Sequence, residues 1–351
     1  MTFSKEQKRL LVAGVIIGAI SFVLVLLGNP KNMGFCIACF VRDIAGGVGL
    51  HRVEAVQYVR PEVIGLLLGS FVVALWKKEF SPRGGSSPML RFVIGFFVMI
   101  GALVFLGCPF RMIIRLAGGD LNALVALFGF SAGIWVGVLF LNRGFSLGRN
   151  FNLPSLEGIA LPAINIVLLS IMVFIPTMLF FSVSGPGSQH APLVASLAAG
   201  LIVGALSQRT RLCMIGGIRD AILFKDWTLL TGFVSIFVTI LILNLATGSF
   251  HPGFADQPIA HTDGLWNFLG MSVVGFGCTL LGGCPLRQMI LAGEGNTDSA
   301  ITVVGLLMGG AFSHNFGLAS SAAGPTVRGQ VATIVALVVL VIIAVANTKQ
   351  E

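Results

Sequence analysis

Long runs of apolar residues, separated by short polar stretches, recur along this chain of 351 residues. A run of about 20 residues is long enough to cross the hydrocarbon core of a bilayer as a helix. Because no water is present there to satisfy backbone groups, spans this apolar are expected to be helical. The pattern predicts ten spans, at residues 10–28, 61–76, 90–107, 121–141, 159–182, 191–206, 227–246, 265–283, 299–317 and 329–346.

Four segments between these spans are too apolar for water, yet too short and too charged to cross a bilayer. They cover residues 33–50, 107–120, 206–224 and 282–295, and each contains or is bordered by glycines. We interpret them as re-entrant helical segments, which enter the membrane and return on the same side. Irregular backbone at that depth is tolerated only where protein buries it or where it lines a cavity. The predicted fold is therefore all-α, a polytopic integral membrane protein with about ten transmembrane helices and four re-entrant segments.

Composition supports the membrane interpretation. Hydrophobic residues make up 56% of the chain, charged residues 10%, and the mean hydropathy is +0.95, whereas about a quarter of a soluble protein is charged. The formal net charge of +8 is dispersed among the spans, so a nucleic-acid partner is not expected. The first apolar run is long for a signal peptide and lacks a cleavage site, so we take it as the first span.

The distribution of Lys and Arg predicts the orientation. With ten spans and a cytoplasmic N-terminus, most of these residues fall in cytoplasmic loops, as the positive-inside rule requires. The segment 247–264 has no Lys or Arg and is expected to be external. The chain is therefore expected in a bacterial inner membrane, with its N- and C-termini in the cytoplasm.

Two short motifs each occur twice, once in each half of the chain. The first is a cysteine followed at +6 and +7 by arginine and aspartate: Cys36, Arg42 and Asp43, then Cys213, Arg219 and Asp220. The second is Cys-Pro-x-Arg: Cys108, Pro109 and Arg111, then Cys284, Pro285 and Arg287. The copies are 177 and 176 residues apart.

This spacing predicts two repeats, residues 1–185 and 186–351, which form one integrated membrane domain. Each repeat holds five spans, an odd number, so the copies are expected to cross the bilayer in opposite senses, as in many secondary transporters. The motifs around Cys36 and Cys108 would then lie on the outer side, and those around Cys213 and Cys284 on the inner side. We interpret the adjacent Arg-Asp residues as structural charge pairs, because an unpaired charge in a membrane is costly.

The Cys-Pro pairs predict where two of the short helices begin. Proline is favoured at the first helical position, so Cys108 and Cys284 are expected at the caps, beside free N–H groups that attract anions. Arg111 and Arg287, one turn further on, add positive potential. If the four segments meet at mid-membrane, they form a thiol-lined constriction. Thiols are soft and polarizable, which suits a small anion containing sulfur or selenium.

Other interpretations of the cysteines compete with this one. Cys278 has no repeat partner and is taken as a small buried residue, while Cys39 could be either packing or functional. Cys36 and Cys39 form a C-x-x-C motif, typical of thiol–disulfide exchange, so a membrane electron carrier is an alternative. The second half has Gly216 at the place of Cys39, which weighs against it. A passive channel for a small solute is a further alternative.

No enzyme activity, cofactor or metal is expected from the sequence. The five histidines show no metal-ligand spacing, and no G-x-x-x-x-G-K-[ST] phosphate-binding loop is present. Any driving force is then an ion gradient, a concentration gradient, or consumption of the cargo inside the cell. A reactive product needs an acceptor, so a cytosolic sulfur- or selenium-carrier protein is a candidate partner.

At these motifs the chain resembles the YeeE/YedE family of sulfur-compound membrane transporters. The most specific strings are Gly34-Phe35-Cys36-Ile37-Ala38-Cys39-Phe40-Val41-Arg42-Asp43, Phe105-Leu106-Gly107-Cys108-Pro109, Arg115-Leu116-Ala117-Gly118-Gly119-Asp120-Leu121-Asn122-Ala123 and Gly282-Gly283-Cys284-Pro285. These strings look most like the branch labelled selenium metabolism protein YedE/FdhT.

The resemblance implies inverted repeats with re-entrant loops, and an anion handed along a line of cysteines by S–H···S contacts. By motif, that line is Cys36, Cys108 and Cys284, with Cys213 as the repeat mate of the first. The expected function is therefore import of a small sulfur- or selenium-containing anion across the inner membrane. The resemblance leaves the cargo open between thiosulfate, selenite and a reduced selenium species.

Overall fold

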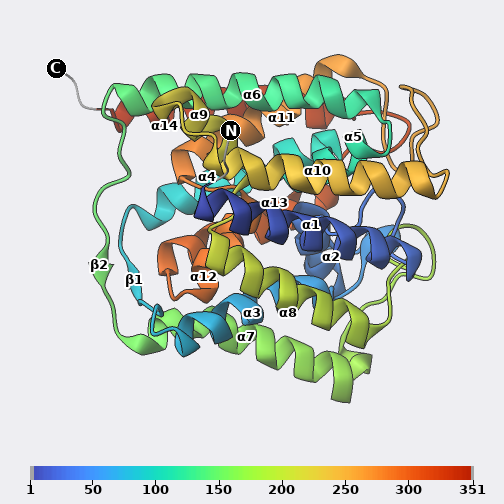
Figure 1. Ribbon diagram of the computed structural model, residues 1–351, viewed down its shortest axis with the longest axis horizontal. Coiled ribbons are helices and arrows are strands. Elements are labelled where there is room, and N and C mark those ends of the chain that lie inside the picture. The colour runs from blue at the N-terminus through green and yellow to red at the C-terminus, as the bar shows by residue number, and fades with distance from the viewer. Residues whose placement is uncertain (1–3, 349–351) are drawn as a thin grey trace.

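Ten long helices lie side by side in the computed structural model, which describes residues 4–348 (Figure 1). They are α1 Lys5–Leu26, α3 Pro61–Trp76, α4 Pro88–Phe105, α6 Leu121–Asn142, α7 Ser155–Phe174, α8 Leu193–Thr210, α10 Thr228–Ala246, α11 Gly264–Leu281, α13 Thr297–Asn315 and α14 Val327–Ala346. Four short helices lie between them: α2 Ile37–Gly47, α5 Pro109–Ala117, α9 Met214–Phe224 and α12 Pro285–Gly293. Two 3-10 turns, η1 Glu54–Val56 and η2 Pro176–Met178, complete the helical elements.

The only strands in the described part of the chain are β1 Arg83–Gly84 and β2 Phe151–Asn152, which pair antiparallel, with Arg83 opposite Asn152 and Gly84 opposite Phe151. The predicted all-α polytopic fold is confirmed, because nine helices within residues 4–348 are long and apolar enough to cross a bilayer. The ninth predicted span, residues 299–317, forms α13, which is the one long helix in the described part of the chain that is not among these nine. This helix carries Asp298, Ser313 and His314, and such polar residues lower its hydropathy.

Local chemistry explains where the helices begin and end. α1 begins at Lys5, earlier than predicted, because Ser4 and Gln7 form a reciprocal capping box. α7 ends at Phe174, well before residue 182, and Pro176 follows; a proline has no N–H to continue a helix. α5 begins at Pro109 and α12 at Pro285, as the Cys-Pro pairs predict.

Four pairs of long helices pack at close range through small residues. The pairs are α1 with α10, α3 with α8, α4 with α13 and α6 with α11. A Cβ added at Gly133 would collide with the Ser272 carbonyl, and one added at Gly305 would collide with the Phe92 carbonyl. Small residues let helix backbones approach closely in a membrane, where dispersion contacts drive association. These glycines therefore set the spacing of the bundle.

The helix contacts also map onto one another when the two halves are exchanged. If α1 to α6 correspond in order to α8 to α13, the α1–α10 contact maps onto α8–α3, and α4–α13 maps onto α11–α6. The short helices follow the same rule, since α2 packs on α13 and α9 on α6, while α5 packs on α10 and α12 on α3. The end of α1 meets the start of α8, where Asn29 Oδ1 accepts a hydrogen bond from the Ala191 N–H at 2.8 Å. This arrangement supports the two inverted repeats, which stay a prediction.

The fifth helix of each half departs from this exchange. α14 packs on α4 and α11, whereas α7 packs on α3 and α12.

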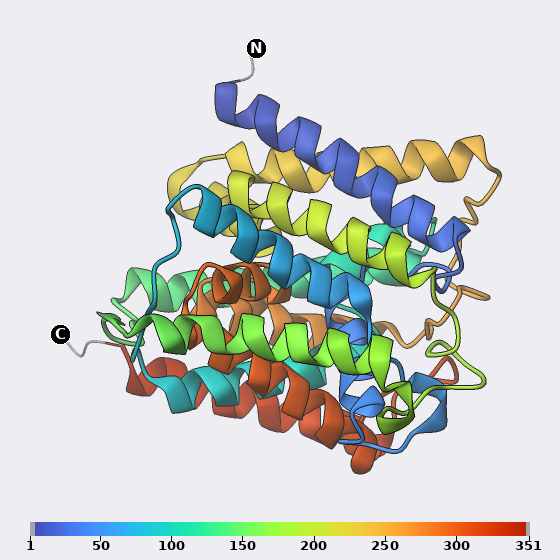
Figure 2. The ribbon, with the colours of Figure 1, turned by 90° about the horizontal axis from the view of Figure 1, so that it is seen from below.

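In Figure 1, α2 and α5 lie toward the right of the bundle, and α9 and α12 lie toward the left. In Figure 2, which is turned by 90°, the start of α1 and the end of α14 both lie in the left half of the molecule. The short helices of the two halves thus lie toward opposite ends of the molecule.

The core of the bundle lies around α11. In the segment Gly264–Gly293, 89% of the most apolar window is buried, against 22% for α7 at the edge. α11 contacts α4, α6 and α14 and leads directly into α12. α2, α5 and α12 are buried over nearly their whole length, whereas α9 is buried only over its first turn, Met214 to Gly217.

The close contact between α6 and α11 generates a stability prediction. Gly133→Ala places a methyl group against the Ser272 carbonyl, and overpacking of this kind costs about 1–3 kcal/mol. We expect a lower melting temperature in detergent, measured by intrinsic fluorescence. Gly264→Ala is the matched control, because its Cβ would meet only Val125 at 3.9 Å. Equal melting temperatures for the two variants would contradict this account of the packing.

Candidate functional site

The four repeated cysteines form two close pairs. Cys36 Sγ lies 3.8 Å from Cys108 Sγ, and Cys213 Sγ lies 4.0 Å from Cys284 Sγ. Each pair joins the two short helices of one half of the chain. All six cysteines are free and buried. The pairing within each half was not part of the sequence prediction, which grouped all four thiols together.

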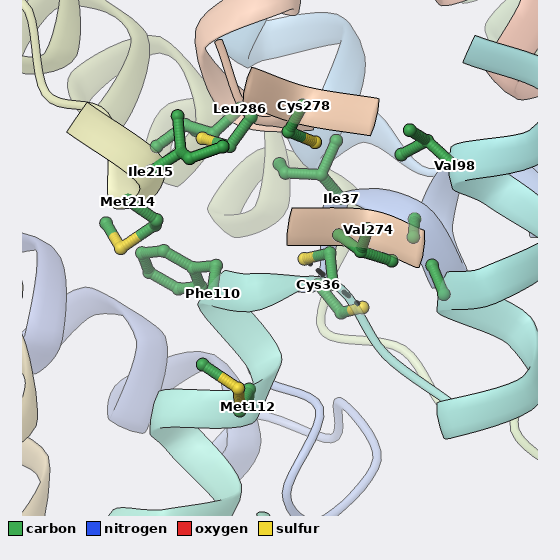
Figure 3. Packing of buried hydrophobic residues seen from close by; sticks show 14 of the residues in the cluster. Cys36, Ile37, Val98, Phe110, Met112, Met214, Ile215, Val274, Cys278 and Leu286 are labelled. Carbon is green, nitrogen blue, oxygen red and sulfur yellow. Dashed lines mark hydrogen bonds between the residues drawn. The ribbon is translucent and has the colours of Figure 1, made fainter. Parts of the chain in front are cut away.

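Side chains from both halves surround these sulfurs in one apolar cluster that contains all four repeated cysteines. Figure 3 shows Cys36 and Cys278 in this cluster, with Ile37 and Val274 between them. Phe110 from α5 and Met214 from α9 lie close by in the same view. The thiols thus face the interior of the protein, and tightly packed apolar side chains surround them.

Each of the four repeated cysteines is the N-cap residue of a short helix: Cys36 of α2, Cys108 of α5, Cys213 of α9 and Cys284 of α12. The Cys36 sulfur accepts a hydrogen bond from the Cys39 N–H at 3.3 Å. The other three cysteines make no side-chain cap hydrogen bond. A helix N-terminus carries partial positive charge, so each sulfur pair lies between two positive helix ends.

Arg111 is fully buried and has no carboxylate within ion-pair distance among the described residues. Its guanidinium donates to the carbonyls of Asn32 and Ile259, both at 3.0 Å, and to that of Leu106. Arg111 Nη1 also lies 3.4 Å from Cys39 Sγ. A buried cation without a counter-ion is costly, so this position favours an anion.

The repeat mate of Arg111 has a different environment. Arg287 Nη1 lies 3.2 Å from Glu294 Oε1, and both side chains retain some exposure. The sequence prediction treated the two arginines as equivalent sources of positive potential. In the structure only Arg111 is left without a carboxylate, so the two ends of the proposed path differ in charge.

The Arg-Asp motif of the first half is part of a larger network. Asp43 binds Arg42 at 2.6 Å and Arg60 at 2.8 Å, and all three side chains are buried. Arg60 also donates to the carbonyls of Gln189 and Pro186. Arg60 was missed in the sequence, although a lone arginine directly before the Pro61 helix start was the available signal.

The second Arg-Asp pair is simpler. Arg219 and Asp220 bind each other at 2.7 Å, and their side chains are 24% and 15% exposed. A further buried pair, Arg115 with Asp120 at 2.6 Å, lies on α5 and at the cap of α6. Its residues stand in one of the specific strings, but the sequence prediction gave them no role.

Two apolar cavities lie beside the bundle rather than at the thiols. One of about 610 Å³ runs between α1 and α10, lined by residues that include Leu11, Val15 and Val238. The other, of about 190 Å³, lies against α5 and is lined by residues that include Met112, Leu127 and Phe237. No cysteine lines either cavity.

Comparison with known proteins identifies a family. A model of the family described as sulphur transport matches residues 1–136 and 209–350, which is most of the chain. The match does not distinguish the selenium-associated branch from the rest of the family. No curated protein matches the chain.

The two Arg-Asp motifs provide an internally matched test of buried charge. Asp43→Asn leaves two buried guanidinium groups without a carboxylate, and breaking such a network costs about 3–5 kcal/mol. Asp220→Asn breaks a more exposed pair, which is expected to cost about 1 kcal/mol or less. Thermal unfolding in detergent measures the difference. A similar loss in both variants would contradict the buried network.

Proposed function

The chain belongs to the sulphur transport family, and from this premise we propose that it imports a small sulfur- or selenium-containing anion past its cysteine pairs. The observation that carries the proposal is the placement of the repeated cysteines. Each is the N-cap of a short helix inside the protein, and they form two pairs with sulfur separations of 3.8 and 4.0 Å. In this proposal the pairs are successive contact points for the anion.

The chemistry of each contact point suits a soft anion. Thiol sulfur is polarizable and only a weak hydrogen-bond donor, so it can touch a sulfur or selenium atom without holding it tightly. The N-termini of the short helices supply the complementary positive field. A hard, strongly hydrated anion such as sulfate gains less from thiol contacts, so we expect the site to select against it.

Arg111 is proposed to provide the main attraction on the side of Cys36 and Cys108. Its charge is balanced only by carbonyl groups and the Cys39 sulfur, so an anion would replace weaker partners. Arg287 is expected to attract the anion less strongly, because it already forms an ion pair with Glu294. If Cys36 and Cys108 face the outside, as the distribution of basic residues predicts, the site with the stronger attraction is on the side from which the anion is taken up.

Transport requires the packed interior to open. The six cysteines are buried, so the structure corresponds to a closed state in this proposal. We propose that the two repeats rock against each other, as in other transporters built from inverted repeats. The α1–α8 and α4–α11 contacts, each of which maps onto itself when the halves are exchanged, are the expected contact surfaces for that motion.

Uptake into proteoliposomes tests the role of the thiols. We expect labelled thiosulfate or selenite to enter vesicles containing the protein, and sulfate to enter much more slowly. Cys108→Ala and Cys284→Ala should each lower the uptake rate at least tenfold, because each removes one sulfur of a pair. Cys278→Ala is the matched control, since Cys278 is buried in the same cluster but has no repeat mate. Full uptake in the Cys108 and Cys284 double variant would show that these thiols contribute only to packing, and it would contradict the proposal.

The same vesicles test the charge difference. Arg111→Gln should raise the anion concentration for half-maximal uptake by about tenfold or more, since a hydrogen bond to a charged group contributes about 1.5–3 kcal/mol. Arg287→Gln should have a smaller effect, because Glu294 already neutralises this arginine. The dependence of the initial rate on thiosulfate concentration measures both. An equal effect of the two substitutions would refute the asymmetry.

The electron-carrier alternative gives a different result in the same membranes. It requires a Cys36–Cys39 disulfide that cycles with a cytosolic reductant, without solute flux. Trapping of free thiols, followed by mass spectrometry, reports that disulfide directly. In the structure the Cys36 sulfur lies next to Cys108, outside the C-x-x-C motif, as well as next to the Cys39 N–H, and the Cys39 sulfur lies next to Arg111.

A further inference from the structure

Glu62 is a buried carboxylate without an ion-pair partner. It lies in the first turn of α3, directly after Pro61, and its exposure is 0%. Oε1 accepts hydrogen bonds from Asn29 Nδ2 at 2.9 Å and from Ser196 Oγ at 3.1 Å. Oε2 is buried and has no hydrogen-bond partner. No Lys, Arg or His in the described part of the chain lies within ion-pair distance of either oxygen.

This environment stabilises the carboxylate incompletely. An ionised carboxylate can accept about four hydrogen bonds, but Glu62 accepts two, both from neutral groups. Ionisable side chains inside membrane proteins are costly and are typically found in ion and proton pathways. A proton on the free Oε2 would remove the charge, and Oε1 would still be able to accept weaker hydrogen bonds from Asn29 and Ser196. The site can therefore hold the side chain in either protonation state.

None of the charged and titratable groups around this turn forms a direct ion pair with Glu62. Tyr58 and Arg60 are on its own segment, but Arg60 is bound to Asp43 of α2. His190, which leads into α8, stacks on Tyr58 with ring centroids 4.1 Å apart. α12, which also packs on α3, has its Arg287 and Glu294 paired with each other. The nearest groups from the ends of α1 and α8 are the neutral Asn29 and Ser196.

One side chain links Glu62 to the first cysteine pair. Asn29 is buried, and its amide nitrogen donates both to Glu62 Oε1 and to the Gly34 carbonyl at 3.0 Å. Its oxygen accepts from the Ala191 N–H at 2.8 Å. Gly34 lies two residues before Cys36. Asn29 therefore ties the carboxylate of α3 to the segment that positions the Cys36 thiol and to the start of α8.

We propose that Glu62 is a proton-binding site that couples proton entry to anion import. A proton from the outer solution binds Glu62 Oε2 and converts the carboxylate to the neutral acid; the same proton leaves toward the cytoplasm later in the cycle. A hydrogen bond to an ionised acceptor is roughly twice as strong as one to a neutral acceptor. Protonation thus weakens the Asn29 bond, frees Gly34 and Cys36 to move, and allows Ser196 Oγ to turn to its other acceptor, the Ala191 carbonyl at 3.4 Å.

The inference rests on the proposed import function, and two measurements separate them. Proteoliposomes containing the protein are given an acidic exterior, with the membrane potential held at zero by valinomycin and equal potassium. Labelled thiosulfate should accumulate above its external concentration. Counterflow, the exchange of external label for internal unlabelled thiosulfate, needs no proton gradient and reports transport itself. No counterflow in the unmodified protein would sink the proposed function; counterflow without proton-driven accumulation would overturn only the role of Glu62.

Glu62→Gln is the decisive variant, because it retains an oxygen for Asn29 and Ser196 and mimics the neutral acid. We expect accumulation driven by the proton gradient to fall at least tenfold, while counterflow stays within about twofold of the unmodified protein. Glu79→Gln is the control; Glu79 lies in an exposed ion pair with Arg209, and its removal should change neither measurement. Unchanged accumulation in Glu62→Gln would overturn the proposal.

One further measurement does not depend on the folding of that variant. A lumenal pH dye should report acidification when thiosulfate is added to vesicles of the unmodified protein, and a constant lumenal pH would refute proton coupling.

Discussion

The structure depends on one constraint: a helix that begins inside a membrane protein has free backbone N–H groups in its first turn that water cannot reach. The first turn of any helix has four such groups, and an unsatisfied polar group in an apolar environment is costly. Four short helices begin here inside the bundle, and each is capped by a cysteine. Thiol sulfur is a weak acceptor, and three of these cysteines make no side-chain hydrogen bond to the N–H groups of the helix that they cap. The arrangement keeps positive helix ends poorly satisfied, which is the condition under which an anion is attracted.

The rest of the fold encloses these four helix ends. Close contacts through glycine, such as Gly133 against Ser272 and Gly305 against Phe92, bring the long helices near enough to exclude lipid from the centre. α11 and α4 lie in contact at the middle, so neither cysteine pair is exposed. In a membrane the hydrophobic effect does not drive helices together, because lipid tails are as apolar as the side chains. Close packing therefore has to supply the stability. Small residues at the helix contacts are thus a requirement of the buried site as well as of the bundle.

Local rules of helix formation were readable in the sequence, whereas contacts between distant segments were not. Pro61, Pro109 and Pro285 fix the first residue of three helices through their missing N–H groups. The overlong prediction for residues 159–182 failed because the apolar pattern continues past Pro176, where the helix cannot. The duplicated motifs indicated which cysteines belong together by ancestry, but their partners depend on how the short helices are rotated. Nothing in the spacing of Cys36 and Cys39 predicts that Cys36 packs against Cys108.

The missed charges share a physical reason. Arg60 and Glu62 flank Pro61 at the start of a span, where a sequence pattern normally places solvent-exposed residues. In the structure both have an exposure of 0%, because the segments before α8 and after α1 cover this helix end through Gln189, Ala191 and Asn29.

This coverage has no equivalent at the other end of the molecule. The pair formed by Arg219 and Asp220 stays partly exposed, and Arg287 has its own carboxylate. The cysteine motifs occur in both halves of the chain, but Arg111 and Glu62, which are buried without an ion-pair partner among the described residues, both lie in the first half. A transporter built from equivalent halves would bind its cargo equally from both sides. In the proposed import cycle, the unequal burial of Arg111 and Glu62 relative to the second half would make the two sides of the path differ in their affinity for the anion.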